Sequence, residues 1–278
     1  MKRLLIVGYG DIARRARRRL PADVEVALIS RSLGADLDRP ETLAASMGQG
    51  DTVLYTAPPP AAGEGDPRAS NLLAAFDRGR IIPARIVYLS TSGVYGDCGG
   101  DWVAETRPVN PQSSRAMRRV AAEDGLRSWC AEKRVPFVVL RVPGIYATDR
   151  LPLESIRTGA PVFRDEDDVY TNHVHAEDLA AICLRATEDS APPGTYNASD
   201  DSAVKMGEWF DLLADRFGLP RPPRLPRAEA AKVISPTRLS FMLESRRLVN
   251  LKMKRDLGVT LVYPTVFDGV PRQSAALA

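Results

Sequence analysis

Short, continuous apolar runs alternate with longer amphipathic stretches along the first half of the chain. Runs rich in Val, Ile and Leu are typical of strands that are buried on both faces of a parallel sheet. We expect such strands at Arg3–Val7, Val24–Ile29, Thr52–Thr56, Ala84–Leu89 and Phe137–Arg141. Helical stretches separate most of them, and repeated strand–helix–strand units predict a doubly wound, parallel α/β (Rossmann) sheet.

The first helix, which follows the first strand, shows helical spacing of its apolar residues. These residues are Ile12, Ala13, Ala16 and Leu20. The same spacing predicts that the arginines between them face solvent, and these are Arg15, Arg18 and Arg19. We therefore interpret this basic run as a solvated face rather than as an anion-binding patch.

The character of the chain changes after Tyr146. Residues 165–168 are all acidic, and the proline-rich segment 220–226 cannot form a regular helix. We predict a sheet domain of residues 1–146 that also takes in a return segment at about 172–198. A smaller C-terminal lobe is predicted from residues 147–171 and 199–278. The expected helices in these parts are Asp178–Ala186 and Val204–Phe217.

The composition is that of an ordinary globular protein. Of the 278 residues, 44% are hydrophobic and 26% are charged, which excludes a disordered chain and a coiled coil. The net charge of +3 is too small to indicate a nucleic-acid or membrane partner, and no apolar run approaches the roughly 20 residues that cross a bilayer. Cys98, Cys130 and Cys183 are far apart and form no CxxC pair, so we expect a soluble, cytoplasmic protein without disulfides.

Glycines after the first strand indicate dinucleotide binding. The sequence Gly8-Tyr9-Gly10-Asp11-Ile12-Ala13 lies between a strand and a helix, as the fingerprint G-x-G-x-x-G/A requires. Gly8 permits the tight turn, and Gly10 lets the backbone approach a pyrophosphate. The first helical residues, Asp11 and Ile12, are expected to direct backbone N–H groups toward the phosphates. The alternative is a turn that uses glycine for conformation alone.

The end of the second strand favours NADP over NAD. Sites for NAD usually carry an acidic residue about 20 positions after the glycines, but this strand ends in Ile29-Ser30-Arg31-Ser32. One guanidinium and two hydroxyls suit a 2′-phosphate dianion. Residues 36–38 are expected to border the adenine. Three residues at the end of the next strand are also predicted to face the cofactor, namely Thr56, Ala57 and Pro58.

Further motifs follow in order along the chain. Residues 87–97 read VYLSTSGVYGD, residues 140–146 read LRVPGIY, and residues 172–179 read NHVHAEDL. Together with the glycines, they resemble the extended short-chain dehydrogenase/reductase superfamily, the NAD(P)-dependent epimerases and dehydratases, over nearly the whole chain. The resemblance implies a nicotinamide cofactor with Pro143 beside it. By analogy with the family, it also implies a homodimer that forms through the helix carrying residues 115–123.

The family's active site combines a Ser or Thr with a Tyr and a Lys, the last two spaced Y-x-x-x-K so that both share one helix face. Thr91 keeps the hydroxyl position, with Ser92 beside it. The Tyr and Lys positions are occupied by Arg115 and Arg119, and an arginine stays protonated and cannot transfer a proton. We expect Arg119 to hold the nicotinamide ribose and Arg115 to bind an anionic substrate group. The alternative is that both face solvent.

The missing tyrosine leaves the proton donor open. Tyr146 follows Pro143 and Gly144 at the edge of the sheet where ligands bind, so it is our first candidate for proton donor and substrate contact. Tyr95 is a second candidate for substrate contact, and its alternative is structural packing. The only histidines lie two residues apart, and since no third ligand accompanies them, no metal site is predicted.

Two functions are compatible with these motifs. The first is an NADP-dependent oxidoreductase or epimerase-like enzyme that acts on a small polar carbonyl or alcohol, a class that includes sugar-nucleotide-like compounds. The second is a catalytically inactive NADPH-binding sensor or regulatory module. The nearly complete set of family motifs favours the first function, and the missing Tyr and Lys favour the second.

Overall fold

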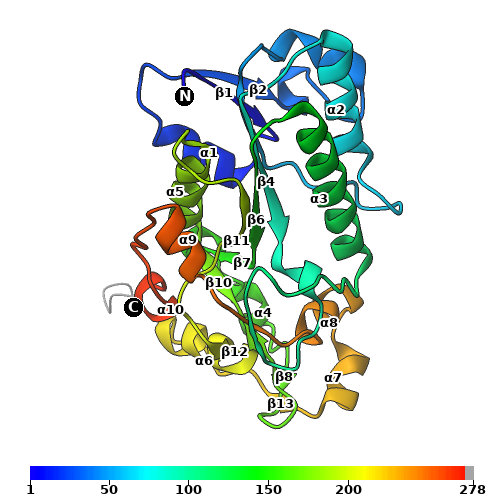
Figure 1. Cartoon of the computed structure of the whole chain (residues 1–278). Coiled ribbons are helices and arrows are strands. Elements are labelled where there is room, and N and C mark those ends of the chain that lie inside the picture. Colours follow the sequence, from blue (N-terminus) through cyan, green and yellow to red (C-terminus); the bar gives the residue numbers. More distant parts are fainter. Residues whose placement is uncertain (273–278) are drawn as a thin grey trace.

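The computed structural model describes residues 1–272, and a six-stranded parallel sheet forms its centre (Figure 1). The strand order is β11-β6-β4-β3-β1-β2. The strands are β1 (Arg3–Val7), β2 (Glu25–Ile29), β3 (Thr52–Tyr55), β4 (Arg85–Thr91), β6 (Phe137–Val142) and β11 (Gly194–Asn197). The predicted fold class is confirmed, and the five predicted strands agree with the observed ones to within two residues at each end.

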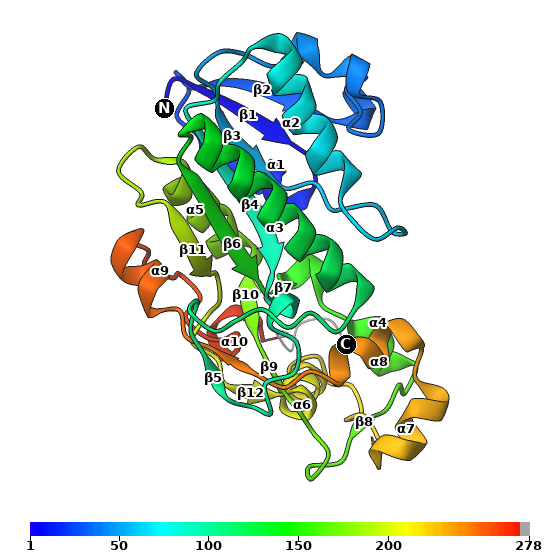
Figure 2. The same cartoon turned by 45° about the vertical axis from the view of Figure 1, so that its right-hand side comes forward.

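Helices cover both faces of this sheet (Figure 2). One face packs against α1 (Asp11–Arg18) and α5 (Ala176–Thr187), and the other packs against α2 (Pro67–Gly79) and α3 (Ser114–Lys133). Successive side chains of a strand point to opposite faces, so Leu4 and Ile6 join the first core while Leu5 and Val7 join the second. Burial on both faces explains why these strands are apolar at every position.

The order in which successive strands join the sheet reverses between β1 and β3. Strand β1 pairs with β2 on one side and with β3 on the other, and Val7 is in register with both Ile29 and Tyr55. The residues that follow these three strands therefore meet at one edge of the sheet. In open α/β sheets, a reversal of strand order opens a crevice at the carboxyl edge, and ligands bind there.

Short elements complete the fold. The short strands form four pairs, which are β7 (Gly144–Tyr146) with β10 (His173–His175), β9 (Tyr170–Thr171) with β12 (Val204–Lys205), β8 (Val162–Phe163) with β13 (Arg224–Leu225), and β5 (Trp102–Val103) with β14 (Arg247–Leu248). Single-turn 3-10 helices span Arg31–Leu33, Pro40–Thr42, Ala44–Ser46, Ser92–Tyr95 and Thr148–Arg150. Within residues 1–272, no helix is both long enough and apolar enough to span a membrane.

A second group of helices packs into a lobe with its own core. These helices are α4 (Leu153–Arg157), α6 (Met206–Arg216), α7 (Arg227–Val233), α8 (Pro236–Met242) and α10 (Val266–Gly269). Trp209, Phe210 and Phe163 are among the buried residues of this core. The helix predicted from Val204 begins at Met206, because Val204 and Lys205 pair with β9 as a short strand.

One C-terminal segment lies elsewhere than the sequence indicated. Residues 247–261 were assigned to the lobe, but β14 pairs with β5, and the following helix α9 (Leu251–Asp256) packs against β11. Met253 and Leu257 are buried in the same core as α1 and α5. This segment therefore crosses back from the lobe and extends the central domain.

Arg15 was predicted to face solvent, and this prediction is wrong. The residue is only 8% exposed. Its guanidinium contacts three carboxylates, at 3.0 Å from Asp11, 2.7 Å from Asp149 and 2.6 Å from Glu177. Because two of these carboxylates come from distant parts of the chain, the helical spacing of α1 alone could not identify Arg15 as a buried ion-pair residue.

Candidate functional site

A groove of about 480 Å³ opens at the carboxyl ends of β1, β2 and β3. Its walls contain eight of the predicted cofactor residues, which are Gly8, Gly10, Ser30, Arg31, Ser32, Thr56, Ala57 and Pro58. The strand register described above explains why these residues meet, although they come from three separate segments. Asp36 and Leu37, which the sequence placed near the adenine, also line the groove.

The two glycines of the fingerprint have different structural roles. Gly8 has a φ of +89°, and a Cβ atom there would lie 2.6 Å from the backbone nitrogen of Ala57. At Gly10, a Cβ atom would meet no other atom within 4 Å. Gly10 also precedes α1 without capping it, so the first amides of the helix have no side-chain acceptor at this end. This open helix end fits a pyrophosphate.

Basic and hydroxyl groups gather where β2 ends. Arg31 is exposed, and its guanidinium has no hydrogen-bond or ion-pair partner among the described residues. The hydroxyls of Ser30 and Ser32 lie 3.0 Å apart. Arg68, from α2, also lines the groove and lies 2.6 Å from Asp38. Sequence reasoning missed Arg68, because it is 37 positions after Arg31 and no local pattern connects the two.

A smaller cavity continues from the groove along the edge of the sheet. Gly10 and Thr56 line both spaces, and the smaller one adds Asp11, Ile12 and Arg119. The Arg119 guanidinium donates to the Leu89 carbonyl at 2.8 Å and to the Tyr88 hydroxyl at 3.0 Å. These two bonds hold Arg119 at the end of β4. The positively charged side chain therefore lines the smaller cavity beside the end of β4.

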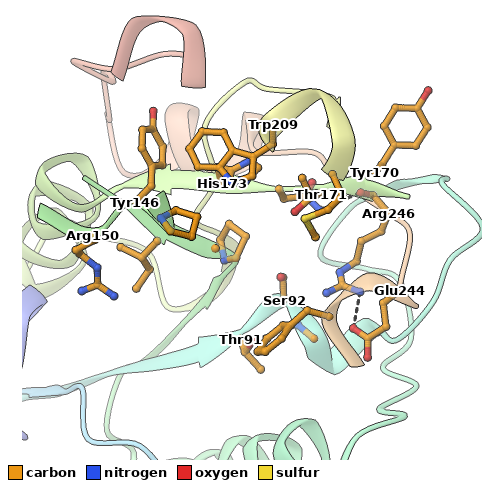
Figure 3. Close-up of a pocket in the computed structure, with 18 of the residues that line it drawn as sticks. Thr91, Ser92, Tyr146, Arg150, Tyr170, Thr171, His173, Trp209, Glu244 and Arg246 are labelled. Carbon is orange, nitrogen blue, oxygen red and sulfur yellow. Dashed lines mark hydrogen bonds and ion pairs between the residues drawn. The ribbon is translucent and has the colours of Figure 1, made fainter. Parts of the chain in front are cut away.

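A third cavity, of about 350 Å³, lies between the sheet and the lobe (Figure 3). It joins the smaller cavity, because Ile145 and Arg150 line both. Thr91 and Ser92, which the sequence predicts at the reaction centre, and Pro143, which it predicts beside the cofactor, line the sheet side of this cavity. A dinucleotide that lies along the first two spaces would thus place its far end beside this third one.

Thr91 lines the cavity, and its hydroxyl proton has no acceptor among the described residues. Its Oγ1 accepts a hydrogen bond from the Gly93 amide at 3.2 Å, so its own proton remains available for a ligand. Behind it, the Ser90 hydroxyl donates to Glu123, which forms a buried ion pair of 2.8 Å with Arg141. These buried contacts tie β4 to α3 and β6 and fix the end of β4 that presents Thr91.

Two predicted tyrosine roles do not agree with the structure. The Tyr146 ring lines the cavity, but its hydroxyl points away from Thr91 and donates to the Thr265 carbonyl at 3.2 Å (Figure 3). Burial raises the pKa of Tyr146, so its proton is held more firmly than usual. Tyr95 is buried outside the cavity and donates to Asn197 at 2.8 Å. Tyr146 is therefore not placed as the proton donor, and Tyr95 has a packing role.

Arg115 lines the cavity, and the lobe adds neighbours that the sequence did not reveal. Its guanidinium stacks on the Phe241 ring, with 3.9 Å to the ring centroid. Glu244 and Arg246 form a buried ion pair of 2.8 Å on the same side (Figure 3). Phe241, Glu244 and Arg246 are more than 120 positions after Arg115, and their role depends entirely on how the lobe folds.

The wall opposite Thr91 is aromatic. Tyr146, His173 and Trp209 stack there, with 4.4 Å between the ring centroids of His173 and Trp209. Burial lowers the pKa of His173 to about 3, so the imidazole stays neutral near pH 7. Among residues 1–272, no group of three His, Cys, Asp or Glu side chains is arranged to hold a metal ion.

Comparison with known proteins is consistent with this geometry. Residues 68–199 match the NAD dependent epimerase/dehydratase family. A curated relative, a 3-diazoavenalumate denitrifying reductase from a Streptomyces species, is 25% identical over 103 residues, which are 37% of this chain and 34% of that protein. The chain thus aligns with about a third of that relative's length.

Solved structures match nearly the whole chain. A conserved protein of unknown function from Silicibacter pomeroyi is 30% identical with a TM-score of 0.76, over 97% of this chain and 96% of that one. UDP-glucose 4-epimerase of Thermus thermophilus, in complex with NAD, is 20% identical with a TM-score of 0.76, over 97% of both chains. A human epimerase family protein with NADPH is 18% identical with a TM-score of 0.73, over 96% of this chain and 97% of that one. Residues 68–199 thus contain a domain of the NAD dependent epimerase/dehydratase family, and nearly the whole chain shares the fold of solved epimerase structures.

Proposed function

We propose that this protein is an NADP-preferring oxidoreductase or epimerase-like enzyme that acts on a small polar carbonyl or alcohol. Solved relatives in complex with NAD or NADPH support a nicotinamide cofactor. The three connected spaces support an orientation in which the adenosine lies near Arg31 and the reacting end lies near Thr91.

The observation that carries the NADP preference is the group at the end of β2. Arg31 offers a guanidinium without a protein partner, and the hydroxyls of Ser30 and Ser32 flank it. A carboxylate at this position would bond the ribose hydroxyls of NAD and repel a 2′-phosphate. A guanidinium forms strong, charge-assisted bonds to phosphate instead.

In this proposal, the residues around Thr91 orient and polarise the substrate. The bound nicotinamide would supply or accept a hydride. The Thr91 hydroxyl would donate to the reacting oxygen, and the Arg115 guanidinium would bind an anionic group elsewhere on the substrate. Arg119, held by Leu89 and Tyr88, would bond the nicotinamide ribose.

A second candidate is a sensor or regulatory module that binds NADPH without turnover. The observation that favours it is the pair Arg115 and Arg119 at the positions of the family's Tyr and Lys. The tyrosines that line the cavity do not replace the lost donor, because the hydroxyls of Tyr146 and Tyr170 both point away from Thr91 (Figure 3). NADPH binding without NADPH oxidation on any carbonyl of a broad panel would support this second candidate.

The cofactor preference is tested by Arg31→Ala. Titration calorimetry with NADPH and with NADH should show a loss of at least about tenfold in affinity for NADPH and less than about twofold for NADH, because a charge-assisted contact is removed from only one of them. Arg39→Ala is the control, since Arg39 is exposed nearby but outside the groove. Equal losses for both coenzymes would contradict the NADP preference.

The proposal includes a cytoplasmic location, a small-molecule substrate and a homodimer formed through α3, without nucleic-acid or membrane partners. Cys98, Cys130 and Cys183 are all free and buried, which suits a reducing compartment. The small net charge of +3 gives no support to nucleic-acid binding.

A further inference from the structure

The cavity between sheet and lobe contains three arginines, and only two of them have a carboxylate partner. Arg150 lies 2.7 Å from Asp11, and Arg246 lies 2.8 Å from Glu244. The Arg115 guanidinium makes no hydrogen bond or ion pair with any described residue. Arg115 is therefore the one arginine of the three whose guanidinium N–H groups have no acceptor among the described residues.

A guanidinium without a hydrogen-bonded carboxylate is unusual at Arg115, because the residue is half-buried. Burial lowers the pKa of Arg115, which reflects the cost of removing the guanidinium from water, and the nearby Glu244 carboxylate offsets this cost only in part. Stacking on Phe241 holds the flat group in place at 3.9 Å from the ring centroid. Its N–H donors thus remain available for an anion, and a planar guanidinium fits a carboxylate through two parallel hydrogen bonds.

The opposite, aromatic wall of the cavity favours a ligand with an uncharged, planar group. Tyr146, His173 and Trp209 form a contiguous aromatic cluster, and the imidazole of His173 is neutral near pH 7. Aromatic rings pack well against other flat rings at such distances. The volume of about 350 Å³ is near the lower limit for small-molecule sites, which is about 300 Å³. A compound with a single ring is therefore a better match than a large, flexible one.

We propose that the cavity binds a small aromatic carboxylate, whose carboxylate group pairs with Arg115 and whose ring packs against Trp209. The carbonyl or alcohol of this compound lies at Thr91. This substrate class rests on the proposed function for the identity of the reacting group. The binding of the acid itself depends only on the cavity, so it can be measured with or without a coenzyme.

The test compares two probes that differ only in charge. 4-Carboxybenzaldehyde and its methyl ester share the ring and the aldehyde, and only the first carries a carboxylate. Calorimetry on the intact protein, with and without NADPH, should show the acid binding at least about tenfold more tightly than the ester. In Arg115→Gln, the preference should fall below twofold. Arg127→Gln is the matched control, because Arg127 lies on the same helix outside the cavity and should leave the preference unchanged.

Three outcomes would overturn the inference. They are equal binding of acid and ester, an unchanged preference in Arg115→Gln, and tighter binding of UDP-glucose than of the aromatic acid. The NADPH titration on the same samples reports on the proposed function separately. Charge-dependent binding of the acid without NADPH binding would refute the proposed function alone, whereas NADPH binding without discrimination between the probes would refute this inference alone.

Discussion

Tyr146 illustrates, at the scale of a single residue, how position in a motif differs from the direction of a side chain. The motif correctly places the residue at the edge of the sheet, and its ring does line the cavity. Its hydroxyl, however, packs against Gly269 and bonds the Thr265 carbonyl in the lobe. The phenol therefore joins the lobe to the sheet and does not face the reaction centre.

Tyr146→Phe should accordingly leave catalysis intact. The loss of one buried hydrogen bond should reduce the free energy of unfolding by about 1 kcal/mol. The rate of NADPH oxidation with 4-carboxybenzaldehyde should remain within about twofold of the unmodified protein. Thr91→Val is the comparison variant, since it removes the hydroxyl that faces the substrate and should reduce that rate by at least about tenfold. Loss of turnover in Tyr146→Phe at unchanged stability would restore the tyrosine as the proton donor.

At the scale of an element, the two glycines of the turn between β1 and α1 have different roles, one in folding and one in ligand binding. Gly8 is required by the backbone, because its φ of +89° and its close approach to Ala57 leave no room for a side chain. Gly10 has an ordinary φ of −82° and open space around it. Its lack of a side chain therefore matters only when a ligand approaches the helix end.

Two alanine substitutions should distinguish these roles. Gly8→Ala should reduce the free energy of unfolding by at least about 1–3 kcal/mol, the usual cost of such backbone strain. Gly10→Ala should change stability by less than about 0.5 kcal/mol, yet it should weaken NADPH binding by at least about tenfold, because the methyl group would occupy the space that the pyrophosphate needs. Urea unfolding and calorimetry on both variants check this. If Gly10→Ala bound NADPH normally, the pyrophosphate would have to lie elsewhere.

The elements that could be predicted from the sequence are those encoded by neighbouring residues. The central strands and the glycine turn were found because each is encoded by neighbouring residues, through continuous apolar runs or a short motif. Arg15 was misjudged because its partners Asp149 and Glu177 lie more than 130 positions away. The cavity residues of the lobe, such as Trp209, were missed for a similar reason, since local periodicity identifies a core position but not which cavity it borders.

At the scale of the whole molecule, the end of β11 connects the central sheet with the lobe. Asp200, three residues after that strand, is 3% exposed. Its backbone amide donates to the His173 carbonyl at 2.8 Å, and its Oδ1 accepts from the Ser202 amide at 2.9 Å. The other carboxyl oxygen is buried without a hydrogen-bond partner among the described residues. Burial, together with the nearby carboxylates of Asp201 and Asp178, raises the pKa of Asp200 to about 8.

This raised pKa predicts a pH dependence of global stability with a definite sign. Between about pH 4 and pH 8, the unfolded chain has lost the Asp200 proton while the folded chain keeps it, so the folded state binds more protons and its stability falls as the pH rises. Asp200→Asn cannot ionise. The free energy of unfolding of this variant, measured in urea at pH 5, 7 and 9 and expressed relative to the unmodified protein, should therefore increase from pH 5 to pH 8 and then level off. Using the difference cancels the opposing contributions of other carboxylates, such as Glu177, whose pKa its arginine partners lower. Parallel curves at all three pH values would mean that the folded protein holds Asp200 ionised, and that the junction between sheet and lobe tolerates a buried charge.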